Sequence, residues 1–241
     1  MINRSIEPEW LDALPSENPG AIGSRRDLQR LNAWMGNARI VARALTLVGN
    51  GHKPAQLVEV GAGDGTFLLE VVRRLPSSWG HSRATLVERQ NIFSVCIAQE
   101  FAKLGWELET IQADVFDWCD NSAGQVQGEI IIANLFLHHF APPQLAYLLC
   151  SLSRRAQVVV SVEPRRSLWS LVFSRMVGII GCNPVTQHDA PASVRAGFKG
   201  RELSEVWPRR EKWSLREHEA GAFSHLFVAT RLESRFQAVE C

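Results

Sequence analysis

The sequence has almost no excess of charge of either sign, with 26 lysines and arginines against 25 aspartates and glutamates in 241 residues. A protein that binds nucleic acid through its phosphates carries a basic surplus or a basic stripe. The arginine pairs of this chain are scattered along it. We therefore expect no nucleic-acid partner. The length suffices for one α/β domain with its own core.

Paired cysteines and long apolar runs are also lacking. The five cysteines are an odd number and form no Cys-x-x-Cys pair, which argues against a zinc ribbon or a disulfide framework and for a cytoplasmic protein. The first fifteen residues contain acids and no apolar core, unlike a signal peptide. The most apolar stretch, Leu168 to Ile180, is shorter than the roughly 18–20 residues of a membrane span. It suits a lipid tail or peripheral membrane contact, and a plain core helix equally well.

Short apolar strands alternate with helical patterns through most of the chain. Such alternation predicts a Rossmann-like α/β fold, with a doubly wound parallel sheet and helices on both faces. Two further strands around a turn at Glu219-Ala220-Gly221 predict a C-terminal hairpin with one reversed strand, which brings the sheet to seven strands. Strands are expected at 56–60, 84–88, 107–112, 129–134, 156–161, 211–218 and 223–232, and helices at 25–48, 66–75, 92–104, 143–153, 168–181 and 198–207. We expect residues 183–191 to form a loop.

A glycine-rich segment follows the first predicted strand and leads into a helix. It reads Gly61-Ala62-Gly63-Asp64-Gly65, with Glu59 two residues before it. Glycines let a backbone turn tightly and approach a ligand, and the following helix offers free N–H groups. The spacing differs from the G-x-G-x-x-G of dinucleotide folds. Asp64 would repel a pyrophosphate but would favour the sulfonium and ammonium charges of S-adenosylmethionine.

Acids also end the next two predicted strands. Glu88, followed by Arg89, ends the second strand, where a carboxylate can accept both hydroxyl hydrogens of a ribose. Asp114 and Val115 follow the third strand, where an acid can accept the adenine amino group while apolar side chains cover the ring.

These segments together resemble the class I S-adenosylmethionine-dependent methyltransferases over about residues 55–165. The resemblance implies that S-adenosylmethionine is the cofactor and S-adenosylhomocysteine the product. It implies a cofactor loop with Glu88 at the ribose, Arg89 beside it, Asp114 and Val115 at the adenine, and Asn134 beside the methionine moiety. The implied loop consists of Glu59, Gly61, Ala62, Gly63, Asp64 and Gly65.

The fourth predicted strand continues into His138-His139, which is similar to the double histidine of ubiquinone- and menaquinone-type methyltransferases. Either imidazole suits removal of a phenol proton at neutral pH, although one of them serves equally well to order the turn that follows. We take Asp189, in a polar segment with His188, Ser193 and Arg195, as a third catalytic candidate. No further ligands at metal spacing stand out, so no metal is expected.

The resulting hypothesis is methylation of a small hydrophobic acceptor, a phenolic, quinone-like or polyketide-derived hydroxyl or ring carbon, as in secondary metabolism. Residues 1–50 would form an arm and a lid helix over the cleft. Residues 51–241 would form the methyltransferase domain, with an acceptor-specificity insertion at 165–210. A non-catalytic S-adenosylmethionine-binding protein stays open as an alternative. A macromolecule methyltransferase fits less well, because the fourth strand lacks an Asn/Asp-Pro-Pro-Tyr motif. The sequence does not indicate an oligomeric state.

Overall fold

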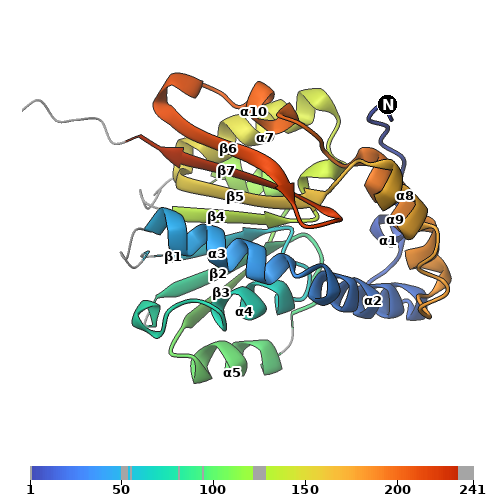
Figure 1. The fold of residues 1–241 in the computed structure, drawn as a ribbon. Coiled ribbons are helices and arrows are strands. Elements are labelled where there is room, and N and C mark those ends of the chain that lie inside the picture. Colours follow the sequence, from blue (N-terminus) through green and yellow to red (C-terminus); the bar gives the residue numbers. More distant parts are fainter. Residues whose placement is uncertain are drawn as a thin grey trace, which may run out of the picture.

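A seven-stranded sheet runs through the protein in the order β3-β2-β1-β4-β5-β7-β6 (Figure 1). The computed structural model describes residues 2–49, 54, 56–80, 82–93, 95–121 and 129–232. Strands β1 to β5 are parallel, and β7 runs antiparallel to both β5 and β6, which confirms the predicted fold. The strands are β1 Gln56–Val60, β2 Arg83–Glu88, β3 Glu107–Gln112, β4 Glu129–Asn134, β5 Ala156–Pro164, β6 Trp213–Ala220 and β7 Ser224–Arg231.

Helices cover both faces of the sheet because both faces are apolar. Side chains alternate along a strand, so Leu57 of β1 packs into one core cluster while Val58 packs into the other. Helices α3, α4 and α5 contribute to the first cluster, and α6, α7 and α10 to the second. The α-helices are α1 Trp10–Ala13, α2 Pro19–Met35, α3 Asn37–Gly49, α4 Thr66–Val72, α5 Val95–Lys103, α6 Val115–Asn121, α7 Pro142–Arg155, α8 Leu168–Ser174, α9 Pro184–Ala196 and α10 Glu202–Val206, and the 3-10 helices are η1 Ser77–Trp79, η2 Leu137–His139 and η3 Arg210–Lys212.

The predicted helix over residues 25–48 is wrong as a single element. Gly36 adopts a left-handed conformation, φ 72°, and caps α2, while α3 starts at Asn37 in a new direction. Side chains disfavour this conformation and glycine does not. The break lets α2 extend over the cleft while α3 packs on the sheet (Figure 1). The predicted boundary at residues 50–51 lies outside the described residues.

The predicted loop over residues 183–191 is also wrong, because these residues lie mainly in α9. Asn183 caps that helix by accepting a hydrogen bond from the Thr186 amide at 2.9 Å. Pro184 takes the first turn, where its missing N–H costs nothing, and Pro191 stands inside the helix. Burial of Val185, together with Ala192 and Ala196, favours the helix over the breaking effect of proline.

Two smaller differences affect the surroundings of the site. Helix α6 covers Val115–Asn121, in a stretch between the third and fourth strands for which the sequence predicts neither a helix nor a strand. Helix α8 ends at Ser174, earlier than predicted, and is followed by turns to residue 181. Among the described residues, no helix combines the length and the apolar character that crossing a membrane requires.

Candidate active site

The carboxyl ends of β1 to β4 border a cleft that α1, α2, α8 and α9 cover (Figure 1). Two cavities occupy this cleft, with volumes of about 490 and about 430 Å³. The larger one reaches from the ends of β2 and β3 to α8 and α9, and the smaller one lies between β1, α2 and α4. They meet along a shared wall of Leu28, Trp34, Gly61 and Leu135. The cleft is therefore one elongated site with two compartments.

The glycine loop separates the two compartments. A side chain at Gly61, where φ is +66°, would place its Cβ 2.1 Å from the Phe136 ring, so only glycine fits there. The loop is tied to the end of β2, because the Gly63 amide donates to Glu88 at 3.0 Å. The other Glu88 oxygen accepts from the Gln90 amide, also at 3.0 Å. Glu88 thus organises the loop and also faces the larger cavity.

The next predicted residues lie beside Glu88. Asp114 and Val115 line the larger cavity together with Arg89. One oxygen of Asp114 accepts from the Phe116 amide at 2.8 Å, which fixes the carboxylate at the start of α6. The structure therefore brings together the acids that end β2 and β3, on one side of the glycine loop.

Five further predicted cofactor residues line the smaller cavity, namely Glu59, Ala62, Gly63, Asp64 and Asn134, whereas Gly65 lines neither of the two cavities. The Glu59 carboxyl group is buried, and one of its oxygens has no hydrogen-bond partner among the described residues. Burial, with the nearby charges of Asp64 and Glu88, raises the pKa of Glu59 well above its ordinary value. A cation or an N–H donor that enters the cavity would favour the ionised form of Glu59 and pair with this oxygen.

A buried amide network connects Asn134 to the hinge between α2 and α3. The Asn37 amide donates to Asn134 at 3.1 Å and to Asn32 at 2.8 Å, and it accepts from the Ser224 hydroxyl at 2.6 Å. On the same side, Gln29 of α2 donates to Asp64 at 2.5 Å. Asn37 was predicted only as part of the lid helix, and Asn32 and Gln29 were not identified from the sequence. The two asparagines flank Gly36. Polar side chains on both sides of a glycine in a predicted helix could have indicated this network.

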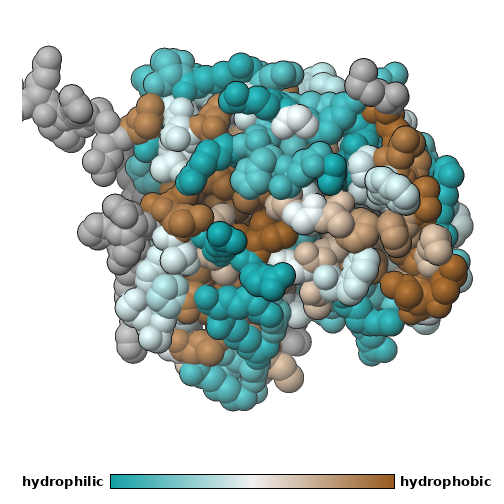
Figure 2. All heavy atoms as spheres, in the orientation of Figure 1, coloured by the Kyte–Doolittle hydropathy of each residue, from teal (hydrophilic) through white to brown (hydrophobic). Residues whose placement is uncertain are grey.

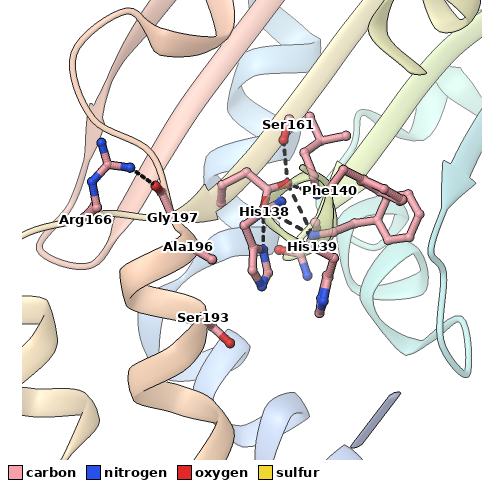
Figure 3. A network of polar contacts seen from close by, with 12 residues as sticks. His138, His139, Phe140, Ser161, Arg166, Ser193, Ala196 and Gly197 are labelled. Carbon is pink, nitrogen blue, oxygen red and sulfur yellow. Dashed lines mark hydrogen bonds and ion pairs between the residues drawn. The ribbon is translucent and has the colours of Figure 1, made fainter. Parts of the chain in front are cut away.

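His138 forms a buried pair with Glu163 (Figure 3). Its Nδ1 lies 2.8 Å from Glu163 Oε2, and both side chains are almost fully shielded from solvent. Glu163 also accepts from the Leu137 amide at 2.9 Å and from the Ser161 hydroxyl at 2.8 Å. These bonds fix the orientation of the imidazole, whose residue lines the larger cavity and whose Nε2 is buried. Glu163 was missed, although an acid inside the apolar strand β5 was a visible signal.

Glu9 brings a second carboxylate to His138 from the N-terminal arm, defined here as residues 2–14. Its Oε1 lies 3.5 Å from His138 Nε2, an ion pair in which Nε2 has no hydrogen-bond partner. Burial lowers the pKa of His138, but the two carboxylates outweigh this effect and raise it to about 9. His138 is therefore protonated at neutral pH while Glu9 stays in place. No sequence signal identified Glu9.

His139 is more exposed than His138 and turns to the arm. Its Nδ1 lies 3.2 Å from Asp12. Glu9, His138 and His139 each bring one potential ligand atom within 4.8 Å of the others, an arrangement that can hold a metal ion. The ion pair between Glu9 and His138 already balances the charges of this group, so a metal is not needed to account for it.

The polar residues of α9 hold the arm. Asp189 accepts from the amides of Trp10 and Leu11 at 2.8 and 2.9 Å, and His188 stacks on the Trp10 indole with ring centroids 3.8 Å apart. The Ser193 hydroxyl donates to Glu9 at 2.5 Å. Asp189, predicted as catalytic, thus caps α1 with both of its oxygens and does not line either of the two large cavities.

Comparison with solved structures identifies the fold. An O-methyltransferase family protein from Burkholderia thailandensis is 15% identical with a TM-score of 0.60, over 91% of this chain and 63% of that one. The plantazolicin methyltransferase BamL, solved with a triazolic desmethylPZN analog and SAH, is 12% identical with a TM-score of 0.64, over 89% and 92%. The mitomycin 7-O-methyltransferase is 16% identical with a TM-score of 0.57, over 92% and 60%.

The chain therefore has the fold of the class I S-adenosylmethionine-dependent methyltransferases, as the resemblance in sequence implies. It spans less than two thirds of the Burkholderia protein and of the mitomycin enzyme. No protein-family model and no curated protein matches the sequence.

Proposed function

We propose that the protein transfers a methyl group from S-adenosylmethionine to a small, largely apolar acceptor. The first candidate for the methylated group is an aromatic hydroxyl, and the second is an activated ring carbon. The observation that carries this proposal is the arrangement of acids around the glycine loop. Glu59, Glu88 and Asp114 end three adjacent strands and border a cleft that continues into a cavity containing a buried histidine.

The residues of the cleft fit S-adenosylmethionine. In the smaller cavity, the unpartnered oxygen of Glu59 and the carboxylate of Asp64 suit the ammonium and sulfonium charges. Arg39, which also lines this cavity, suits the methionine carboxylate. Gly61 belongs to the shared wall of the two cavities and packs against the Phe136 ring. On the far side, Glu88 is placed for the ribose hydroxyls.

Asp114 and Val115 complete the cofactor site at its adenine end. The Asp114 carboxylate would accept from the amino group of the base, and the Val115 side chain would cover the ring. When bound, S-adenosylmethionine supplies a methyl group that is already activated on a sulfonium, so the protein mainly orients the acceptor and manages its proton.

The acceptor compartment lies beyond the loop in the larger cavity. Its wall is mostly apolar, and the polar groups on the side of α8, α9 and η2 include Ser170, Ser193 and His138. A cavity that is mostly apolar with a few convergent polar groups is the usual form of a small-molecule site. The other apolar groups that line it include Leu31, Met35, Phe136, Phe140, Phe173 and Val177.

His138 would act on the acceptor's hydroxyl group in two forms. With Glu9 in place the ring is an imidazolium at neutral pH, which would stabilise the acceptor's oxyanion, and only the neutral ring would take the acceptor's proton. Its pKa of about 9 makes it a stronger base than an ordinary imidazole, and this value is within about one unit of a phenol. Proton transfer between groups of similar pKa is nearly balanced in free energy. A phenolate formed in this way would be stabilised beside the imidazolium, and Glu163 would keep the ring oriented. The names of the plantazolicin and mitomycin enzymes, both small-molecule methyltransferases, support an acceptor of this class.

Calorimetry tests the donor. We expect S-adenosylmethionine and S-adenosylhomocysteine to bind, and NAD not to bind. Asp114→Asn should weaken S-adenosylhomocysteine binding by about tenfold, because a charged hydrogen bond is worth about 1.5–3 kcal/mol. Glu109→Gln, an exposed position of β3 outside both cavities, is the control. Binding of NAD alone would refute the proposal.

Turnover tests the acceptor side. The protein is incubated with phenolic and quinol compounds and isotopically labelled S-adenosylmethionine, and products heavier by one methyl-for-hydrogen exchange are sought by mass spectrometry. His138→Gln should abolish most of the transfer to hydroxyl groups while leaving S-adenosylhomocysteine binding intact. A protein that binds the cofactor but methylates none of these acceptors would favour the non-catalytic alternative.

A further inference from the structure

Helix α8 and the turns that follow it bury serines and expose large apolar side chains. Ser170 and Ser174 are buried and line the larger cavity. Trp169 is 74% exposed and Ile179 is 78% exposed. A helix that packs on a protein core normally buries its apolar side and exposes its serines. A plain core helix, one interpretation of this segment from sequence, therefore does not describe it.

These exposed side chains form a continuous surface, which we call the apolar patch. Two ring contacts extend it to α2, because Phe223 lies 5.3 Å from Phe173 and 5.0 Å from Trp34. In Figure 2 the hydrophobic residues gather along the right-hand edge, over α8 and the turns after it. Contiguous exposed apolar surfaces of this kind usually mark a binding face. The apolar patch consists of Trp34, Leu168, Trp169, Val172, Phe173, Met176, Ile179 and Ile180.

Basic groups border the patch, although the whole chain is nearly neutral. Residues 164–188 contain three arginines and no acid, and among these Arg175 is exposed between the apolar side chains. Arg30 of α2 donates to the Ile180 carbonyl at 3.2 Å, so its guanidinium lies at the edge of the patch. Arg30 also pairs with the buried Asp27 at 3.2 Å, and Arg165 and Arg166 pair with Glu219 and Glu202. Arg175 is therefore the arginine that gives the patch its positive charge. The patch therefore combines tryptophan, aliphatic side chains and arginine, the composition of a surface that lies in a membrane interface.

The larger cavity begins directly behind this surface. Phe173 is both part of the patch and part of the cavity wall, and Val177 lines the cavity from the turn that follows α8. A molecule dissolved in a bilayer that covered the patch would have a short, apolar path to His138.

We propose that the apolar patch docks on the surface of an anionic lipid bilayer, from which the protein takes an acceptor dissolved in the membrane. The part that concerns the acceptor rests on the proposed function, and the docking itself does not. A second copy of the chain fits the patch less well. In a two-fold dimer the same patch faces itself, which would bury the exposed Arg175 of both copies in one apolar interface.

Vesicle binding tests the docking and needs no cofactor. The protein is sedimented with vesicles of phosphatidylcholine alone and of phosphatidylcholine mixed with phosphatidylglycerol. We expect binding to the mixed vesicles that weakens as salt is raised. Trp169→Glu and Ile179→Glu should each reduce binding at least about tenfold, because each removes a large apolar group that the bilayer would bury and adds a charge. Arg175→Glu should remove the preference for phosphatidylglycerol.

Leu47→Glu is the matched control, because Leu47 is 62% exposed near the end of α3 away from α8 (Figure 1). This variant should bind vesicles like the native protein. The proposal would be overturned if the patch variants bound vesicles as tightly as the native protein does. An absence of vesicle binding would also overturn it. A dimer seen by light scattering that Ile179→Glu dissociates would then assign the patch to a second copy of the chain.

Calorimetry with S-adenosylhomocysteine separates this proposal from the proposed function. The patch variants should keep native affinity for S-adenosylhomocysteine. Loss of vesicle binding with retained cofactor binding therefore concerns the patch alone. Vesicle binding by a protein that does not bind S-adenosylhomocysteine would refute the proposed function and leave the docking surface intact.

Discussion

The charge of Glu9 sets the protonation state of His138, and replacing Glu9 by glutamine tests this directly. The exchange keeps the size and shape of the side chain but removes its negative charge. In the native protein the carboxylate oxygen lies 3.5 Å from His138 Nε2, and the two groups are shielded from solvent. Glu163 remains on the opposite side of the imidazole at 2.8 Å and keeps its orientation.

The separation of 3.5 Å between Glu9 Oε1 and His138 Nε2 gives the magnitude of the effect. Coulomb attraction across this distance is about 1 kcal/mol in water and about 5 kcal/mol at an effective dielectric constant near 20. One pKa unit corresponds to about 1.4 kcal/mol. Glu9→Gln should therefore lower the pKa of His138 from about 9 by about 1 to 3, which brings it into the range of neutral pH.

Histidine NMR measures this pKa without knowledge of the acceptor. The Cε1–H resonance of His138 is assigned by its loss in His138→Gln and is followed across the pH range. Glu7→Gln is the matched control, since Glu7 belongs to the same arm but is exposed and pairs with Arg195. A native pKa near the ordinary 6.5 of histidine, or equal shifts in both glutamine variants, would refute the reasoning. Once an acceptor is known, the pH dependence of methyl transfer should move with the pKa.

Three further predictions concern stability. The pKa of His138 is higher in the folded protein than in the unfolded chain. Protonated His138 therefore stabilises the fold fully below pH 6.5, and this stabilisation is lost as pH rises toward 9. The native free energy of unfolding should therefore fall by up to about 3 kcal/mol across this range, relative to His138→Gln in matched urea titrations. Gly61→Ala should destabilise by about 1–3 kcal/mol through its overlap with Phe136, whereas Gly63→Ala, whose Cβ meets nothing within 4 Å, should cost about 1; equal losses would contradict the overlap. Asn37→Ala should cost about 1–3 kcal/mol by leaving buried partners unpaired, and an unchanged denaturation midpoint would argue against the amide network.

The sheet could be predicted from local sequence patterns, because the apolar patterning and the turn residues that define a strand lie within a few residues of one another. The strands at 107–112 and 129–134 match the structure in both bounds. In β4 the match follows from burial on both faces, which requires continuous apolar residues, whereas β3 is an edge strand with alternating, largely exposed residues. The glycine loop and the acids after β2 and β3 follow from the same logic. Parallel strands end at one edge of the sheet, so acids at these ends must come together near the loop.

The arm and the helices over the cleft could not be predicted in this way. Proline suggested a loop at 183–191, but tertiary burial favoured helix α9. Gly36 was compatible with a continuing helix, and only the packing of α2 and α3 on different surfaces made it a break. Asp189 looked catalytic because nothing in the local pattern reveals that the Trp10 amide, 179 positions earlier, would satisfy it.

The sequence by itself determined the sheet, the glycine loop and the acids that surround it, because each depends on neighbouring residues or on strand ends that meet at one edge. The tertiary structure alone decided which histidine is buried and which carboxylates charge it. Glu9 and Glu163 come from opposite parts of the chain and meet only at the ring of His138. Their charges act through space over a few ångströms, and no pattern of residues along the chain records that distance.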